Sequence, residues 1–315
     1  MKLIRTMFSC LGNLYYDYRY YKYYSNQFKK SGGGINQKIK GEDEYIRKWK
    51  SLGKFVDRYQ YRLFSQYVGF TPYIVPEDIG RRYLEKFLNP KRFRPFYSDK
   101  NMYDLVMDIS FTPKTYIRRI NGSNLLGEDY KPIQHNIDDL LKTSKGIILK
   151  PSIDTAGGLG VCLFERNDDG MFVNKKTKET LSSSFLLNSG KNFIVQEAVV
   201  QSSSISIFCK TAINTLRISV YRSVKDESLN ILGCVLRIGK QGEIVDNSHS
   251  GGRFVAVDIN TGRVGKQVFD IYGNHTNSWN EVDFSASEYT IPNWNSVIEF
   301  AKKCVTVIII VGYSP

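Results

Sequence analysis

The sequence predicts an α+β protein with largely antiparallel sheets, preceded by a helical N-terminal region. Before about residue 98, apolar residues recur every three or four positions, which is typical of amphipathic helices. After that point, short apolar runs alternate with Gly, Asn and Asp, which is typical of strands and turns. Apolar residues make up 42% of the chain and aromatic residues 13%, a composition that excludes a disordered protein.

Composition also limits the class of partner and the compartment. The 315 residues predict about two domains, at roughly 150 residues each. Lys and Arg number 44 against 31 Asp and Glu, and the resulting charge of +13 favours a polyanionic partner. Five scattered cysteines without a C-x-x-C pair, together with three histidines, predict reduced thiols in a cytoplasmic protein and no metal centre. We expect no signal peptide and no membrane span, because no apolar run reaches about 18 residues.

Residues 1–40 form a basic, tyrosine-rich arm with a glycine linker. Seven tyrosines lie between Tyr15 and Tyr24, mixed with Arg19 and Lys22, and SGGG at 31–34 predicts a flexible joint. Such rings could pack on the body of the protein, stack on nucleic-acid bases or lie at a lipid surface.

Residues 41–97 are predicted to form a helical support region. Apolar positions from residue 42 to 67 have the spacing of one amphipathic helix. A second helix should begin near Pro76 and Glu77, because proline and acidic residues suit a first turn, and Asn89-Pro90 should end it.

Residues 98–315 are predicted to form the main α+β domain. Helical stretches are expected at 101–108 and 294–303. The expected strands are the apolar runs at 147–150, 161–164, 193–199, 216–221, 231–238, 253–258 and 305–311.

The most informative stretch joins the first two of these strands. The first strand ends on Lys150, and a glycine-rich turn over 154–160 leads directly into the next strand. Glycines let successive backbone N–H groups approach a phosphate, and a lysine adds positive charge. A Walker A loop is excluded because GK[ST] is missing and a strand follows. The alternative is an ordinary surface turn.

Two further segments complete an ordered series. Ser98-Asp99-Lys100-Asn101 precedes the loop, and Phe193–Val199 is an apolar strand that contains Gln196-Glu197. The series resembles the nucleotide site of the ATP-grasp superfamily, in which two α+β subdomains hold ATP between β-layers. Asn214-Thr215-Leu216-Arg217, Asp246-Asn247 with Gly251-Gly252, and Val257–Gly262 are similar to the sugar-transfer-associated ATP-grasp family. Its members occur with bacterial capsule and polysaccharide biosynthesis. The likeness runs from about residue 98 to the end.

The resemblance implies a role for each matching residue. The flap subdomain would span about 145–200. Arg217, Asp246 and Asn247 would face the transferring phosphate or the acceptor as catalytic residues. The residues implied to bind ATP are Lys100, Lys150, Asp154, Thr155, Gly157, Gly158, Gly160, Gln196, Glu197 and Val199.

The family pattern places the Mg²⁺ ligands after a strand that resembles residues 307–312. Here Tyr313-Ser314-Pro315 follow, so the resemblance implies a C-terminally truncated member without those acidic ligands. We therefore expect no metal-ligating residues in this chain. We also expect the strand at 305–311 to be an exposed sheet edge prone to association.

The implied function is ATP-dependent ligation, in which a carboxylate is activated as an acylphosphate for cell-surface polysaccharide synthesis. The cofactors would be ATP and Mg²⁺, and the acceptor a carboxylate-bearing or anionic glycan-related molecule. The alternative is a non-catalytic module that binds nucleotide or anionic glycan. Nucleic-acid binding through the arm is a third hypothesis, which nothing else in the chain favours. The expected location is the cytoplasm, with peripheral contact between the arm and the inner membrane face.

Overall fold

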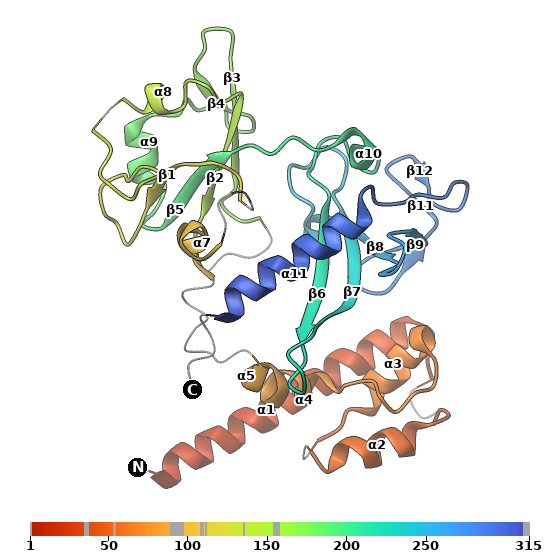
Figure 1. The fold of residues 1–315 in the computed structure, drawn as a ribbon. Coiled ribbons are helices and arrows are strands. Elements are labelled where there is room, and N and C mark those ends of the chain that lie inside the picture. The colour runs from red at the N-terminus through yellow and green to blue at the C-terminus, as the bar shows by residue number, and fades with distance from the viewer. Residues whose placement is uncertain are drawn as a thin grey trace. The chain divides into compact units, whose positions relative to one another are not determined.

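The computed structural model of the chain has two compact units, Met1–Arg94 and Pro95–Pro315 (Figure 1). It describes residues 2–34, 38–52, 55–88, 98–107, 110, 112–134, 136–153 and 158–310. No described helix combines the length with the apolar character that crossing a bilayer requires.

The first unit is helical, and its small core lies between α1 (Lys2–Lys30) and α3 (Arg58–Val68). The side chains of this core are Tyr24, Phe28, Tyr59 and Leu63. The hydroxyl of Tyr24 donates to the carboxylate of Glu77. Five other tyrosines of α1 remain exposed, at positions 15, 16, 18, 21 and 23. The arm is therefore a helix that packs the rings of one face and leaves the others in solvent.

The stretch 42–67, predicted as one helix, is two helices, α2 (Glu42–Lys50) and α3. The prediction missed the break at Asp57, whose backbone is extended. The Asp57 carboxylate accepts the backbone N–H of Tyr59 at 2.8 Å and of Gln60 at 3.4 Å, and so caps α3. This N-cap satisfies donors that a continuous helix would have bonded internally.

The second helix predicted in this unit begins where expected. Pro76 precedes α4 (Glu77–Ile79), which continues through a π-helical turn at Gly80–Leu84 into α5 (Glu85–Leu88). The predicted stop at Asn89-Pro90 lies outside the described residues.

The second unit contains two five-stranded antiparallel sheets, each with its own apolar core. The first sheet has the order β1-β5-β2-β3-β4. Its strands are β1 (Thr115–Arg119), β2 (Gly146–Pro151), β3 (Cys162–Arg166), β4 (Phe172–Asn174) and β5 (Phe193–Glu197). The short helix α8 (Ile137–Leu140) places Ile137 in this core, and α9 (Ser183–Asn188) places Leu186 there.

The second sheet has the order β10-β9-β8-β7-β6, and a β11-β12 hairpin follows it. Its core is built from alternate residues of the central strands, including Leu236, Val255 and Val268. The strands are β6 (Thr215–Arg222), β7 (Leu229–Ile238), β8 (Arg253–Val257), β9 (Val264–Phe269), β10 (His275–Thr276), β11 (Ser278–Trp279) and β12 (Val282–Asp283). The α+β class with antiparallel sheets, predicted from sequence, is confirmed.

The strand predicted at 305–311 is wrong, because residues up to 310 belong to α11 (Trp294–Ile310). This helix packs Trp294, Val297 and Ile298 against the core of the second sheet. Val and Ile cost a helix only tenths of a kcal/mol each, and extending an existing helix adds a hydrogen bond per residue. The exposed sheet edge that we expected from these residues is therefore also wrong.

Candidate functional site

Two lysines from different elements meet at the end of β2. Ile147 and Leu149 enter the core of the first sheet, and Lys150 lies on the opposite face. Lys100 begins the short 3-10 helix η3 (Lys100–Met102). Its Nζ donates to the carbonyl oxygens of Pro151 at 3.0 Å and Ser152 at 3.2 Å. The structure thus brings together the two lysines that the sequence assigned to phosphate binding.

The electrostatics of this pair favour an anion. Burial, and after it the charge of Lys100, lower the pKa of the Lys150 ammonium. Burial lowers the pKa of Lys100 as well, although Asp99 acts in the opposite direction. Within the described part of the chain, no carboxylate pairs with either ammonium. Two neighbouring cations destabilise each other, and a bound phosphate would relieve that cost.

A buried polar cluster holds η3 against the first sheet. The guanidinium of Arg118 on β1 is fully buried and contacts both carboxylate oxygens of Asp104, at 2.6 and 3.1 Å. It also donates to the carbonyl of Asn101 at 2.9 Å and stacks on the ring of Tyr130 at 3.9 Å. The hydroxyl of Tyr130 donates to Asp104 and Asn101. The cluster fixes the turn that presents Lys100, and none of its residues was among the site residues predicted from the sequence.

The glycine-rich turn after β2 is described in part. Asp154, Thr155 and Gly157 lie outside the described residues. Gly158 and Gly160 both have positive φ, of +77° and +72°. A Cβ at Gly160 would lie 2.8 Å from Pro151 Cγ, and one at Gly158 would lie 3.0 Å from Val245 Cγ1. Glycine is therefore needed at both positions, and the turn reaches the residue that precedes Asp246.

The predicted adenine segment lies at the end of β5. Gln196 is buried, and its Nε2 donates to the Pro113 carbonyl and to Thr115 Oγ1, both at 3.1 Å. This side-chain amide therefore ties β5 to β1. The side chains of Glu197 and Val199 are exposed where the chain leaves the first sheet. Their placement leaves them accessible to a ligand.

The predicted acceptor residues lie on the second sheet and the loop beside it. Arg217 is exposed on β6, and no carboxylate among the described residues pairs with it. Asp246 is held by the Thr215 hydroxyl and by Arg237, whose Nη2 lies 3.1 Å from the Asp246 carbonyl and 3.4 Å from Oδ1. Asn247 Nδ2 donates to Ser250 Oγ at 3.1 Å.

Strand register places the basic residues on one face of this sheet. Thr215 lies opposite Arg237, and Arg237 lies opposite Phe254, on the face away from the core residues Leu236 and Val255. Arg217 shares that face, because it is two residues from Thr215 on the same strand. Arg237 was not among the predicted site residues, although it is the one charged residue of β7 and so was a usable signal.

A tight turn supports the acceptor loop, which is the segment 246–252 that carries Asp246 and Asn247. The backbone N–H of Gly252 donates to the Asn247 carbonyl at 3.0 Å. A Cβ at Gly252 would lie 2.8 to 3.0 Å from three backbone carbonyl oxygens, those of Asp246, Asn247 and Ile238. Only glycine fits at this position, which gives a physical reason for Gly252 in the Gly251-Gly252 pair of the sequence.

The described residues do not fit a magnesium site of their own. Among the residues that the structure describes, which leave out positions 311–315, no group of three His, Cys, Asp or Glu side chains is placed to hold a metal ion. Oxygen ligands are what Mg²⁺ requires. The lysine pair, in contrast, fits the phosphates of ATP.

Comparison with known proteins identifies a family. A family model described as sugar-transfer associated ATP-grasp matches residues 80–314, which is more than half of the chain. No curated protein gives a match. No solved structure gives one either. The match to the family model shows that the chain belongs to the sugar-transfer associated ATP-grasp family.

Proposed function

We propose that this protein binds ATP at the Lys100–Lys150 pair and uses it for ATP-dependent ligation of a carboxylate. The observation that carries the proposal is the meeting of two partly buried ammonium groups, neither of which forms an ion pair with a carboxylate among the described residues. Family membership suggests an ATP-binding, ligase-like protein. The two lysines would hold phosphate oxygens, and Gly158 and Gly160 would let the turn approach them.

The other predicted residues take roles that follow from their surroundings. Glu197 and Val199 are exposed beside the first sheet and would contact the nucleoside. Gln196 would act through the backbone, because its side chain holds β1. Arg217 presents a guanidinium that no carboxylate of the described residues pairs, and its planar donors suit a carboxylate or phosphate. Asp246 would orient Arg237 on the same face, and Asn247 would shape the loop beside it.

The substrate class is inferred from the description of the family. We propose an acceptor with a carboxylate or an anionic glycan portion, in cell-surface polysaccharide synthesis such as that of a capsule. The reaction would take place in the cytoplasm. Contact with the inner membrane face would come from the exposed tyrosines and basic residues of α1. The proposed domains are the arm at 1–40, the support region at 41–97 and the ATP-grasp domain from residue 98.

Titration calorimetry with Mg-ATP tests the binding step. Lys150→Gln should weaken binding by roughly tenfold to a hundredfold, because it removes a charged hydrogen bond to phosphate. Lys145→Gln is the matched control, since Lys145 is exposed immediately before β2. Equal affinity for wild type and Lys150→Gln, or no binding to wild type, would contradict the assignment.

Turnover is tested separately by ADP release in the presence of candidate acceptors. Release that depends on Arg217 would support the ligase. ATP binding without ADP release under any acceptor would favour the second candidate, a non-catalytic nucleotide- or anionic-glycan-binding module. The specific observation in favour of that candidate is that the Asp246 carboxylate is already engaged by Thr215 and Arg237.

A further inference from the structure

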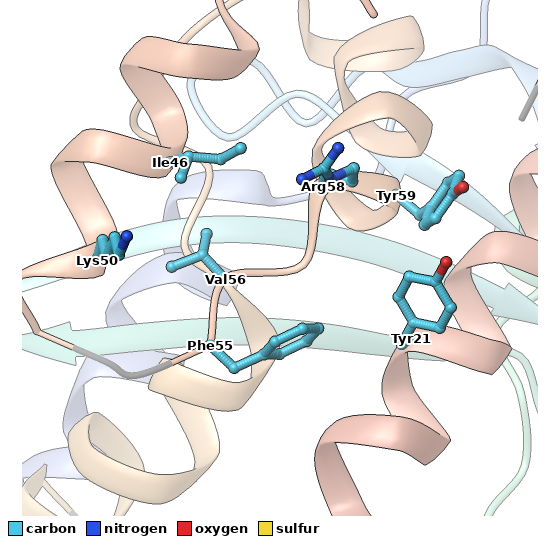
Figure 2. Close-up of a pocket in the computed structure, with 7 residues that line it drawn as sticks. All are labelled: Tyr21, Ile46, Lys50, Phe55, Val56, Arg58 and Tyr59. Carbon is cyan, nitrogen blue, oxygen red and sulfur yellow. The ribbon is translucent and has the colours of Figure 1, made fainter. Parts of the chain in front are cut away.

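The first unit contains a cavity that the ATP site does not use. It has a volume of about 380 Å³ and lies between α1, α2 and the start of α3. Volumes of about 300 to 1,000 Å³ are usual for small-molecule pockets. Figure 2 shows the lining side chains, which are Tyr21, Ile46, Lys50, Phe55, Val56, Arg58 and Tyr59.

The charge of this cavity is entirely positive. Lys50 and Arg58 line it, and none of the lining residues is acidic. Both cationic side chains are exposed, and neither forms an ion pair in the ranges that the structure describes, although the charge of Arg58 acts to lower the pKa of the neighbouring Asp57. The nearest acid in sequence, Asp57, is buried and turned into the N-terminus of α3, where it accepts two backbone N–H groups. The cavity therefore offers two charge-assisted donors for an anion.

Two other arginines of the first unit do form ion pairs. Arg62, one helical turn beyond Arg58, forms a buried ion pair with Glu42, with Nε and Oε2 2.6 Å apart. Arg81 is likewise paired with Glu77. Arg62 and Arg81 thus have acidic partners, whereas Arg58 and Lys50 line a cavity and form no ion pair among the described residues.

The rest of the lining is apolar or aromatic. Figure 2 shows Ile46, Val56 and Phe55 between Lys50 on one side and the two tyrosines on the other. The rings of Tyr21 and Tyr59 meet edge to face, with centroids 5.3 Å apart. An inorganic anion would pair with the cations but make no contact with the apolar side chains Ile46, Phe55 and Val56. A neutral apolar ligand would leave the cations unpaired.

Figure 2 shows Lys50 and Arg58 on opposite sides of Ile46 and Val56. We propose that this cavity binds an anionic amphiphile, with a phosphate headgroup that the flexible side chains of Lys50 and Arg58 hold from the two sides and a hydrocarbon portion against Ile46, Phe55 and Val56. The site is separate from the ATP site and does not depend on its assignment. The headgroup could belong to a membrane lipid or to a soluble phosphorylated hydrocarbon, and the two sources differ in their response to vesicles.

Calorimetry of the full chain with monomeric octyl phosphate tests the proposal. We expect one site per chain, and Lys50→Gln and Arg58→Gln should each weaken binding by about tenfold or more. Arg47→Gln is the matched control, because Arg47 is an exposed cation of α2 that does not line the cavity. Both lining cations are exposed, so these variants should fold as the wild type does.

Three results would overturn the proposal. They are the absence of octyl phosphate binding, equal binding by the lining variants and Arg47→Gln, and equal affinity for inorganic phosphate or for neutral octyl glucoside. Co-sedimentation with vesicles containing anionic phospholipid, lost in Lys50→Gln, would support a lipid headgroup. Octyl phosphate binding without co-sedimentation would support a soluble amphiphile.

Discussion

The buried pair of Arg118 and Asp104 should decide whether Lys100 is presented to a ligand. The Arg118 side chain has no exposed surface, and that of Asp104 is 13% exposed. The substitution Asp104→Asn keeps the shape of the side chain but removes its charge. It leaves the Arg118 guanidinium, whose Nε already lacks a partner, without its counter-ion.

The cost can be worked from this geometry. Asp104→Asn breaks at least one of the two bonds to Arg118, at 2.6 and 3.1 Å, and leaves a buried positive charge. Removing one partner of a buried ion pair costs about 3–5 kcal/mol, a large part of a typical stability of about 5–15 kcal/mol. Burial opposes ionisation of Asp104, but its bonds from Arg118 and Tyr130 outweigh burial and lower its pKa. The contribution of this carboxylate is therefore present above its ordinary value of 3.8 and disappears as pH falls through the lowered folded value.

Hydrogen exchange with mass spectrometry locates the effect. We expect peptides covering 100–106 and 115–119 to lose protection in Asp104→Asn, and Mg-ATP affinity to fall because Lys100 is no longer held. Asp168→Asn, at an exposed hairpin position, is the matched control. If Asp104→Asn exchanges and binds ATP as the control does, the reasoning about this cluster is refuted.

Two other predictions concern the acceptor loop and the first unit. Gly252→Ala should lower the free energy of unfolding by about 1–3 kcal/mol in denaturant titrations, because its Cβ would meet three carbonyl oxygens. Gly233→Ala in β7 is the control, with nothing within 4 Å of the new Cβ, and equal stabilities would contradict the close approach. Burial raises the pKa of Asp57 to about 6 from 3.8, so ionisation should destabilise the wild type as pH rises through this range. Asp57→Asn keeps an N-cap but has no charge to bury. Its free energy of unfolding, relative to that of the wild type, should therefore be higher at pH 8 than at pH 3.5 by on the order of 3 kcal/mol. A gain that does not depend on pH would argue against this cause.

Much of the second unit could be predicted from local patterns. The apolar runs near 147, 193, 216, 231 and 253 are strands because alternate β-branched and aliphatic residues enter a core on one face. The sequence marked Lys150 as a candidate site residue because a charged residue that ends such a run, before a glycine-rich turn, is unusual in a core strand.

The errors have physical causes that lie beyond local sequence. The apolar run at 305–310 has strand-like residues, but it continues a helix that begins at Trp294 and packs on the second sheet. The cluster around Arg118 escaped prediction because its partners, Asp104 and Tyr130, are 14 and 12 residues away in sequence. Such contacts depend on tertiary packing, which no periodicity records.

The central claim is that ATP phosphates lie beside Lys100 and Lys150. An acyl-phosphate derivative of ATP tests it directly, because a lysine amine next to the bound phosphates attacks the acyl carbon, forms an amide and releases ATP. The lowered pKa of both ammonium groups increases the fraction of reactive neutral amine. Peptide mapping should find the amide on Lys150 or Lys100, suppressed by excess ATP and absent from Lys145. Labelling at neither lysine, or labelling that ATP does not suppress, would contradict the account.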